Sequence, residues 1–291
     1  MSKTLISILG GLGGMFGWGT SDFFANFSSD KVGHFKAFFW SQVAGLITVL
    51  SVVLLSGSSI SLSPEILFRI VIAGIAYSLG YLLFYRGFEI GNVSVVSAVI
   101  NIQNLFIILI AALVFHQTLT STQIPALLAV LTGIILVSVD FKELKKGGAV
   151  LSKGVKETLA SALFFGIVYW PLNETISERI DWRVATMMIK IVAISFVFLF
   201  AMFKKEELKI KKGINKKILV AVALTGILEA VGVLGTSFGL AYGDSIIVGP
   251  ISSALTLVTV TLAVIFLKEK LTKIQTLGIL MTVGGIIMTA L

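Results

Sequence analysis

Ten long apolar runs follow one another along the chain, and short polar connectors separate them. A helix rises 1.5 Å per residue, so about 20 mostly apolar residues are needed to cross a hydrocarbon core about 30 Å thick. The runs are continuous and rich in Leu, Ile, Ala and Gly, whereas a membrane β-barrel needs short strands of alternating hydrophobicity. The pattern therefore predicts an all-α integral membrane protein with ten transmembrane helices. The predicted spans cover residues 5–27, 35–55, 67–88, 93–115, 124–139, 155–176, 184–203, 218–240, 245–267 and 274–291.

The chain aligns with itself when it is shifted by 152 positions, so that Trp18 matches Trp170 and Asp22 matches another acid, Glu174. The other matched positions include Gly74, Gly80, Gly87 and Gly91 with Gly226, Gly232, Gly239 and Gly243, and Leu119, Thr120, Gln123 and Gly133 with Leu271, Thr272, Gln275 and Gly285. Each half then holds five spans, an odd number, so the second half must enter the membrane from the opposite side. We expect two inverted five-helix repeats, a common transporter architecture, at residues 1–141 and 155–291, joined by a basic linker at residues 142–154.

Composition agrees with this class, because 56% of the residues are hydrophobic and only 13% are charged. The net charge of +8 does not indicate nucleic-acid binding, since 18 of the 23 Lys and Arg residues lie in the connectors after the odd-numbered spans or at the span ends that adjoin them. Basic residues at such places orient a membrane protein and contact lipid headgroups. The positive-inside rule then places these connectors in the cytoplasm and both chain ends outside.

Several kinds of chemistry have no sequence signal. The chain contains no cysteine, which excludes disulfides, thiolate nucleophiles and thiolate metal sites. Neither His34 nor His116 belongs to a metal-ligand spacing, and no phosphate-binding Gly-Lys-Ser/Thr loop occurs. We therefore expect no cofactor, no metal and no ATP-driven step within this chain.

Short motifs in a fixed order give the chain a family resemblance. The motifs are Phe-Gly-Trp-Gly at 16–19, the glycine hinges at 87–92 and 239–244, Pro250, and Phe-Leu-Lys-Glu-Lys-Leu-Thr at 266–272. With them the sequence resembles the drug/metabolite transporter (DMT) superfamily, in particular its EamA-type members with two five-helix repeats, over essentially the whole chain. The first half departs from the pattern, with Ala98 opposite Pro250 and Gln117 opposite Glu269. The resemblance implies a proton- or gradient-coupled carrier, or an exporter, of metabolites such as amino acids, nucleosides or sugars. The resemblance also implies that both chain ends lie in the cytoplasm, whereas the distribution of basic residues places them outside.

Two charged residues inside predicted spans are the first candidates for function, because ionisable groups in hydrocarbon cost about 2.5 to 3.5 kcal/mol on insertion scales. Glu229 lies near the middle of the eighth span and is expected to couple transport to protons or to substrate. Lys190 lies about seven residues into the seventh span and must snorkel, pair or face water. We expect it to pair with Glu229 or with Glu174. The alternative for Glu229 is a structural pair or hydrogen bond.

Aromatic and acidic residues near the predicted symmetry axis are substrate-binding candidates. Asp22 follows Trp18 by four residues, and Glu174 follows Trp170 by four, so each acid shares a helix face with an indole. The repeat makes these two positions equivalent and predicts that they approach one another, although both could instead mark the membrane interface. The other two candidates, Tyr77 and Tyr81, match Glu229 and Val233, so that aromatic surface of one half could face the carboxyl of the other, or simply pack.

Polar residues recur at helical spacing in the fourth span, where Ser94, Ser97, Asn101 and Asn104 form a stripe. Such a stripe lines a cavity and binds substrate, or it joins helices through hydrogen bonds. We favour the cavity, because two Asn side chains bring more polar surface than tight packing needs. A smaller stripe in the ninth span includes Ser252 and Thr256.

These features favour a secondary transporter, not an enzyme, that moves a small polar or amphipathic metabolite across the cell membrane by alternating access. The expected partners are a small-molecule substrate, membrane lipids and, if transport is proton-coupled, protons. Export, the coupling ion, and a monomeric or homodimeric state stay open. The alternatives are a membrane enzyme acting on lipid-linked substrates, for which the acids are too scattered, and a receptor or scaffold, for which large soluble domains would be expected.

Overall fold

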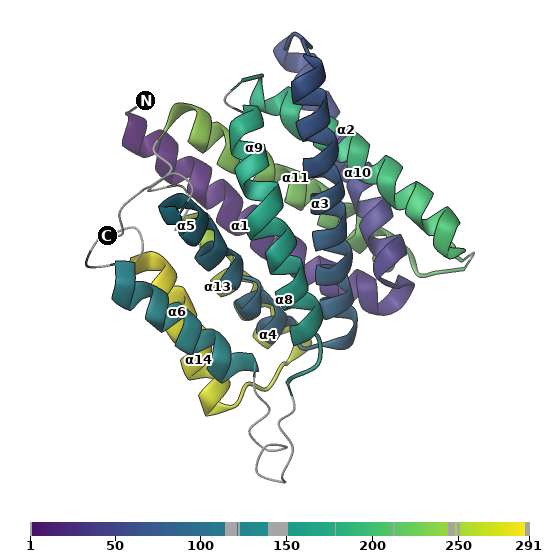
Figure 1. Ribbon diagram of the computed structural model, residues 1–291. Coiled ribbons are helices and arrows are strands. Elements are labelled where there is room, and N and C mark those ends of the chain that lie inside the picture. The colour runs from purple at the N-terminus through teal and green to yellow at the C-terminus, as the bar shows by residue number, and fades with distance from the viewer. Residues whose placement is uncertain are drawn as a thin grey trace.

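The computed structural model describes residues 2–113, 121, 123–138, 151–177, 179–211, 213–243, 248 and 251–288. In this part of the chain the regular elements are helices, and they form one bundle in which both halves contribute to the interior (Figure 1). Residues 142–150 of the basic linker, Gln117 and Pro250 lie outside the described residues.

The helices follow the predicted spans closely. The first half contains α1 (Lys3–Val32), α2 (His34–Ser56), α3 (Pro64–Ile90), α4 (Val93–Val99), α5 (Ile102–Leu113) and α6 (Gln123–Ser138). The second half contains α8 (Val155–Leu163), the π-helix η1 (Phe164–Tyr169), α9 (Trp170–Ser177), α10 (Trp182–Lys204), α11 (Lys216–Tyr242), α13 (Leu255–Leu262), the π-helix η2 (Ala263–Leu267) and α14 (Lys273–Met288). Of the described helices, α2, α3, α10 and most of α11 are long and apolar enough to cross a membrane, and several shorter apolar helices accompany them. The described elements are therefore helical, and the chain is a multi-pass membrane protein.

Local sequence sets the starts of the long helices. The Ser63 hydroxyl accepts a hydrogen bond from the Ile66 amide, and Pro64 occupies the first turn of α3, where its missing N–H costs nothing. The Asp181 carboxylate caps α10 by accepting from the Arg183 amide.

Three predicted spans are not regular α-helices from end to end, and a single unbroken helix was wrong for the fourth and the ninth. The ninth divides at Ala254, directly before α13. The fourth span divides at Ile100 and Asn101, where the Asn101 side chain donates to the Ser97 carbonyl and the backbone bonds shorten to three-residue spacing. The sixth span contains η1 directly before Trp170 and Pro171. Pro171 has no N–H for the carbonyl four residues earlier, which favours a local switch to π-helical bonding.

Corresponding helices of the two halves exchange partners. In the first half α1 packs against α11, and in the second half its counterparts α8, η1 and α9 pack against α3. Likewise α2 packs against α11 while α10 packs against α3, and the pairs α2 with α10 and α6 with α14 join equivalent helices. Figure 1 shows α1 and α8 running in opposite directions, from opposite ends of the bundle. An approximate two-fold relation between antiparallel halves accounts for these contacts.

Close glycine contacts support the same register of 152 positions. A methyl group added to Gly133 would meet Gly278 and Thr282, and one added to Gly285 would meet Ala126 and Val130. The two sets of contacts are equivalent at this register, because Gly285, Gly278 and Thr282 lie 152 positions after Gly133, Ala126 and Val130. The α6 and α14 helices therefore approach each other through equivalent positions, as small residues allow in membrane bundles.

Candidate functional site

A buried ion pair joins α10 to α11 in the middle of the bundle. The Lys190 ammonium contacts the Glu229 carboxylate, and the two side chains are only 2% and 1% exposed. The predicted pairing of Lys190 with Glu229 is therefore confirmed, and the alternative partner, Glu174, lies exposed on α9. Charges this deep require each other, because either one alone would be left uncompensated in a medium of low dielectric constant.

Two residues of the first half complete the polar cluster. The Lys190 ammonium also donates to Gln42 Oε1 on α2 at 2.8 Å, and Tyr77 on α3 donates its hydroxyl to Glu229 Oε1 at 2.7 Å. The Tyr77 hydroxyl lies 3.4 Å from the ammonium, which is 5.7 Å from the centre of the Tyr77 ring. Four helices from both halves thus converge on one ammonium group, and we call Glu229, Gln42 and Tyr77 the ammonium cage.

Gly45 makes room for this arrangement one turn along α2 from Gln42. A methyl group at this position would lie 3.2 Å from the Lys190 nitrogen and 2.9 Å from the Gly226 carbonyl. Sequence reasoning missed both Gln42 and Gly45. A glutamine inside an apolar span was the signal that could have identified the first.

The pseudo-two-fold axis passes through this cluster. Tyr77 and Glu229 are equivalent positions and hydrogen-bond to each other, and the equivalent residues Trp18 and Trp170 form an edge-to-face pair with centroids 6.1 Å apart. The counterpart of Lys190 is Phe38, whose ring lies 6.3 Å from that of Tyr77. One half therefore carries an ion pair where the other carries two aromatic rings.

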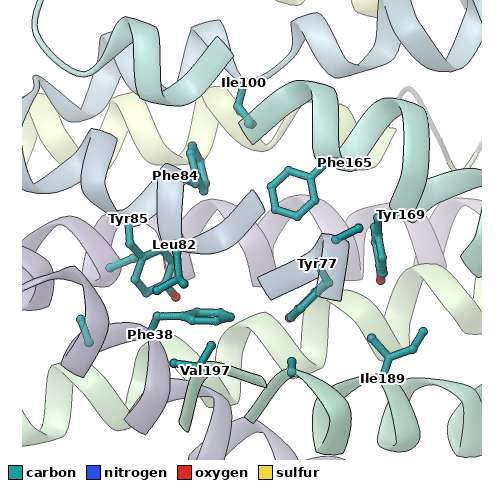
Figure 2. Packing of buried hydrophobic residues seen from close by; sticks show 14 of the residues in the cluster. Phe38, Tyr77, Leu82, Phe84, Tyr85, Ile100, Phe165, Tyr169, Ile189 and Val197 are labelled. Carbon is teal, nitrogen blue, oxygen red and sulfur yellow. The ribbon is translucent and has the colours of Figure 1, made fainter. Parts of the chain in front are cut away.

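Aromatic side chains surround the cage. The Tyr81 ring stacks on Phe38 and contacts Tyr77. The Tyr169 ring also contacts Tyr77, and Figure 2 shows Tyr77 between Phe38 and Tyr169. Beside Tyr77 and Lys190 is a narrow void, also lined by Tyr169, Thr186, Ile189 and Val233, that has no room for a water molecule. The packing leaves no room for substrate at this point.

The remaining predicted site residues are placed as follows. Asp22 on α1 is buried at 6% exposure and close enough to Glu229 to interact with it electrostatically. Its counterpart Glu174 is exposed, so the repeat does not give these two acids the same environment. Asn101 is buried between α4 and α13, where it donates to Thr256 Oγ1 at 2.7 Å. The side chain of Asn104 lies outside the described part of the structure.

Hydrogen bonds join the two halves at both ends of the bundle. At the end of α3 that begins with Pro64, Ser58 donates to Asp181 Oδ2 at 3.0 Å. At the other end, about 40 Å along the helix, the Glu269 carboxylate accepts from the Val93 amide at 2.9 Å and the Ser94 hydroxyl at 2.6 Å. The cage therefore lies between two contacts that each join one half to the other.

Hydrogen bonds make Asp181 a strong acid. The Arg183 guanidinium contributes most, followed by the Arg183 amide and the Ser58 hydroxyl, and together they lower the pKa of Asp181 from 3.8 to about 2. Asp181 is thus ionised at neutral pH and holds the end of α2 against the start of α10.

No group of three or more His, Asp or Glu side chains within the described ranges is placed to hold a metal ion.

Antiparallel helical halves around a buried charged cluster define a class of polytopic membrane protein. The sequence profile of the EamA-like transporter family matches residues 5–139 and 152–291. The chain therefore belongs to the EamA-like transporter family, as the resemblance to EamA-type members of the DMT superfamily predicted, and it contains two copies of the family's repeat.

Two individual proteins are similar to parts or all of the chain. A solved crystal structure, described only as that of a protein, covers 100% of this chain and 99% of its own at 16% identity, with a TM-score of 0.72, and so shares its fold. An uncharacterized protein of Methanocaldococcus jannaschii is 36% identical over 77 residues, 26% of this chain. The match spans 56% of that relative's length.

Proposed function

We propose that the protein is a secondary transporter of the cell membrane, and not an enzyme, that moves a small polar or amphipathic metabolite by alternating access. The substrate is an amino acid-like compound, a nucleoside or a sugar. In this proposal the ten predicted spans all cross the membrane, and the two five-helix repeats are inserted in opposite directions.

The observation that carries the proposal is the buried charged cluster on the pseudo-two-fold axis. A stable bundle needs no ion pair in its interior, because apolar residues of similar volume are often as stable or more stable. Ionisable groups at membrane depth usually mark a pathway for substrate or ions. Here Glu229 and Lys190 receive polar contacts from both halves, so a movement of one half against the other changes their surroundings.

The contacts at the two ends of the bundle support alternating access. The Ser58–Asp181 and Glu269–Ser94 hydrogen bonds each join the first half to the second, at opposite ends of α3. With both made, the interior is occluded, and breaking one at a time opens the cage to one side only. Residues of inverted repeats can take such alternating roles because the halves are equivalent in fold and opposite in direction.

Transport by purified protein in proteoliposomes tests the proposal. A panel of radiolabelled amino acids, amines, nucleosides and sugars is supplied with and without a pH gradient, and the matched variants are Glu229→Gln in the cage and Glu206→Gln on an exposed connector. We expect saturable flux of at least one compound, at least tenfold slower in Glu229→Gln and unchanged in Glu206→Gln. Flux of no compound, or equal flux in both variants, contradicts the proposal.

A further inference from the structure

The polar contacts of Lys190 are those of a complete binding site for an ammonium group. An ammonium has three N–H donors and no acceptor. Around the Lys190 nitrogen lie three oxygen acceptors, from Glu229, Gln42 and Tyr77. A carboxylate charge and neutral oxygen acceptors together recognise a primary ammonium group.

The closed interior depends on the cage being occupied. Glu229 is 1% exposed and the void beside Lys190 has no room for a water molecule, so an empty cage would leave a carboxylate without a counter-charge. Lys190 supplies that charge from a flexible four-carbon chain anchored on α10, outside the cage residues themselves. A free ammonium compound of similar size would satisfy the same acceptors once the ammonium of Lys190 moved aside.

An unused donor in the cage indicates that its full ligand is larger than an ammonium. The Gln42 Nε2 group is buried and has no hydrogen-bond partner among the described residues, although the Oε1 atom of the same amide is fully engaged. Buried amide N–H groups without a partner are rare and costly. A ligand that carries an acceptor oxygen beside its ammonium group would use this donor.

We propose that the ammonium cage of Glu229, Gln42 and Tyr77 binds the primary ammonium group of the transported substrate, and that Lys190 occupies it as a tethered substitute when the carrier is closed and empty. This inference rests on the proposed function and adds a substrate class to it, that of small primary amines with a neighbouring acceptor oxygen. Substrate and Lys190 compete for one carboxylate, so the empty carrier closes without a bound ion.

The other titratable groups around the cage do not supply a competing cation. They are Asp22 from α1, Tyr81 and Tyr85 from α3, and Tyr169 from η1. All of them are neutral or acidic. In the described structure the ammonium of Lys190 is therefore the cation of this site.

The test replaces the tether with a free amine. The Lys190→Ala substitution removes the three outer carbons and the nitrogen of the side chain, which together correspond to n-propylammonium. Since the chain has no cysteine, a single Val233→Cys beside the void reports opening by its reaction rate with a water-soluble maleimide. The rate is measured in proteoliposomes with n-propylammonium chloride or, as a control without N–H donors, tetramethylammonium chloride at equal concentration.

We expect Lys190→Ala to raise the labelling rate at least tenfold over the Val233→Cys parent, and millimolar n-propylammonium to lower it at least fivefold. Tetramethylammonium should have no effect, and the n-propylammonium effect should vanish when Glu229→Gln is added. An unchanged rate in Lys190→Ala, equal effects of the two cations, or an effect that persists without the Glu229 carboxylate overturns the proposal.

A folding defect in the variant does not remove the test. If Lys190→Ala is recovered only when n-propylammonium is present during purification, the amine has replaced the tether as expected. If Glu229→Gln restores the variant and n-propylammonium does not, the cage does not accept a free ammonium and the inference fails.

Because closure is measured without transport, rescue without flux of any compound contradicts the proposed function alone. Flux restricted to compounds without an ammonium group contradicts this inference alone.

Discussion

Removing one charge of the Lys190–Glu229 pair should destabilise the protein strongly, whereas removing both should cost little. The two side chains are 2% and 1% exposed, so solvent does not screen the charge that is left behind. Breaking a buried pair from one side costs about 3 to 5 kcal/mol, and replacing both partners with uncharged residues is often neutral or stabilising. We therefore expect Lys190→Met and Glu229→Gln each to lose about 3 kcal/mol or more, and the double variant to recover at least half of the summed loss.

The sign of the pH dependence separates the two single variants. In Lys190→Met the uncompensated group is a carboxylate, which is neutralised by taking up a proton, so the loss of stability should shrink as the pH falls. In Glu229→Gln the uncompensated group is an ammonium, which is neutralised by releasing a proton, so the loss should shrink as the pH rises. The double variant should show neither trend.

Equilibrium unfolding in mixed micelles, followed by circular dichroism, measures these free energies. Tyr77→Phe is a useful companion, because it removes only the hydroxyl that donates to Glu229 and should cost about 1.5 to 3 kcal/mol. Additive losses, with the double variant as unstable as the sum of the two single variants, would refute the reasoning. Additive effects on transport would equally show that the two residues do not act as one unit.

Three further predictions concern other parts of the bundle. Gly226→Ala places a methyl group against the Ser41 carbonyl and should lower the free energy of unfolding by about 1 to 3 kcal/mol, measured by thermal unfolding. Gly284→Ala is the control: a methyl group there meets no atom within 4 Å, so this variant should be neutral or slightly stabilising. The pKa of Asp181 in the folded protein lies below its ordinary value, so its ionised carboxylate stabilises the fold fully above about pH 4, and this contribution is lost as the pH falls towards 2. When the free energy of unfolding is measured against pH, Asp181→Asn should remove the change in this range. Glu269→Ala removes the acceptor of three hydrogen bonds at the start of α4 and should raise maleimide labelling of a nearby single cysteine at least severalfold; labelling equal to that of unsubstituted Glu269 would show that this contact does not hold the end closed.

The helices could be predicted from sequence because membrane spans need long apolar runs and little else. The predicted eighth span, 218–240, corresponds to α11 (Lys216–Tyr242), and the predicted second span, 35–55, to α2 (His34–Ser56). The break at Asn101 could not be predicted in the same way. It arises from a hydrogen bond of one side chain to the backbone of its own helix, and an apolar pattern carries no information about it.

The centre of the candidate site was predicted in part. Glu229, Lys190 and Tyr77 stood out because charge is rare in spans and because the repeat aligned Tyr77 with Glu229. The role of Gln42 depends on how α2 is rotated against α10, which only packing determines. The equivalence of Asp22 and Glu174 was a weaker guide, since the first is buried and the second exposed. A repeat conserves the path of the chain more closely than the surroundings of each side chain.

The account as a whole requires the cage to open alternately to each side of the membrane. The direct measurement is the reaction of a single cysteine at Val233 with a membrane-impermeant maleimide, added to oriented proteoliposomes from the outside or enclosed within them. The account predicts slow labelling from both sides when neither contact is cross-linked. Fixing the Ser58–Asp181 contact by a cross-link should restrict labelling to one side, and fixing the Glu269–Ser94 contact should restrict it to the opposite side. Labelling from the same single side whichever contact is fixed would contradict it.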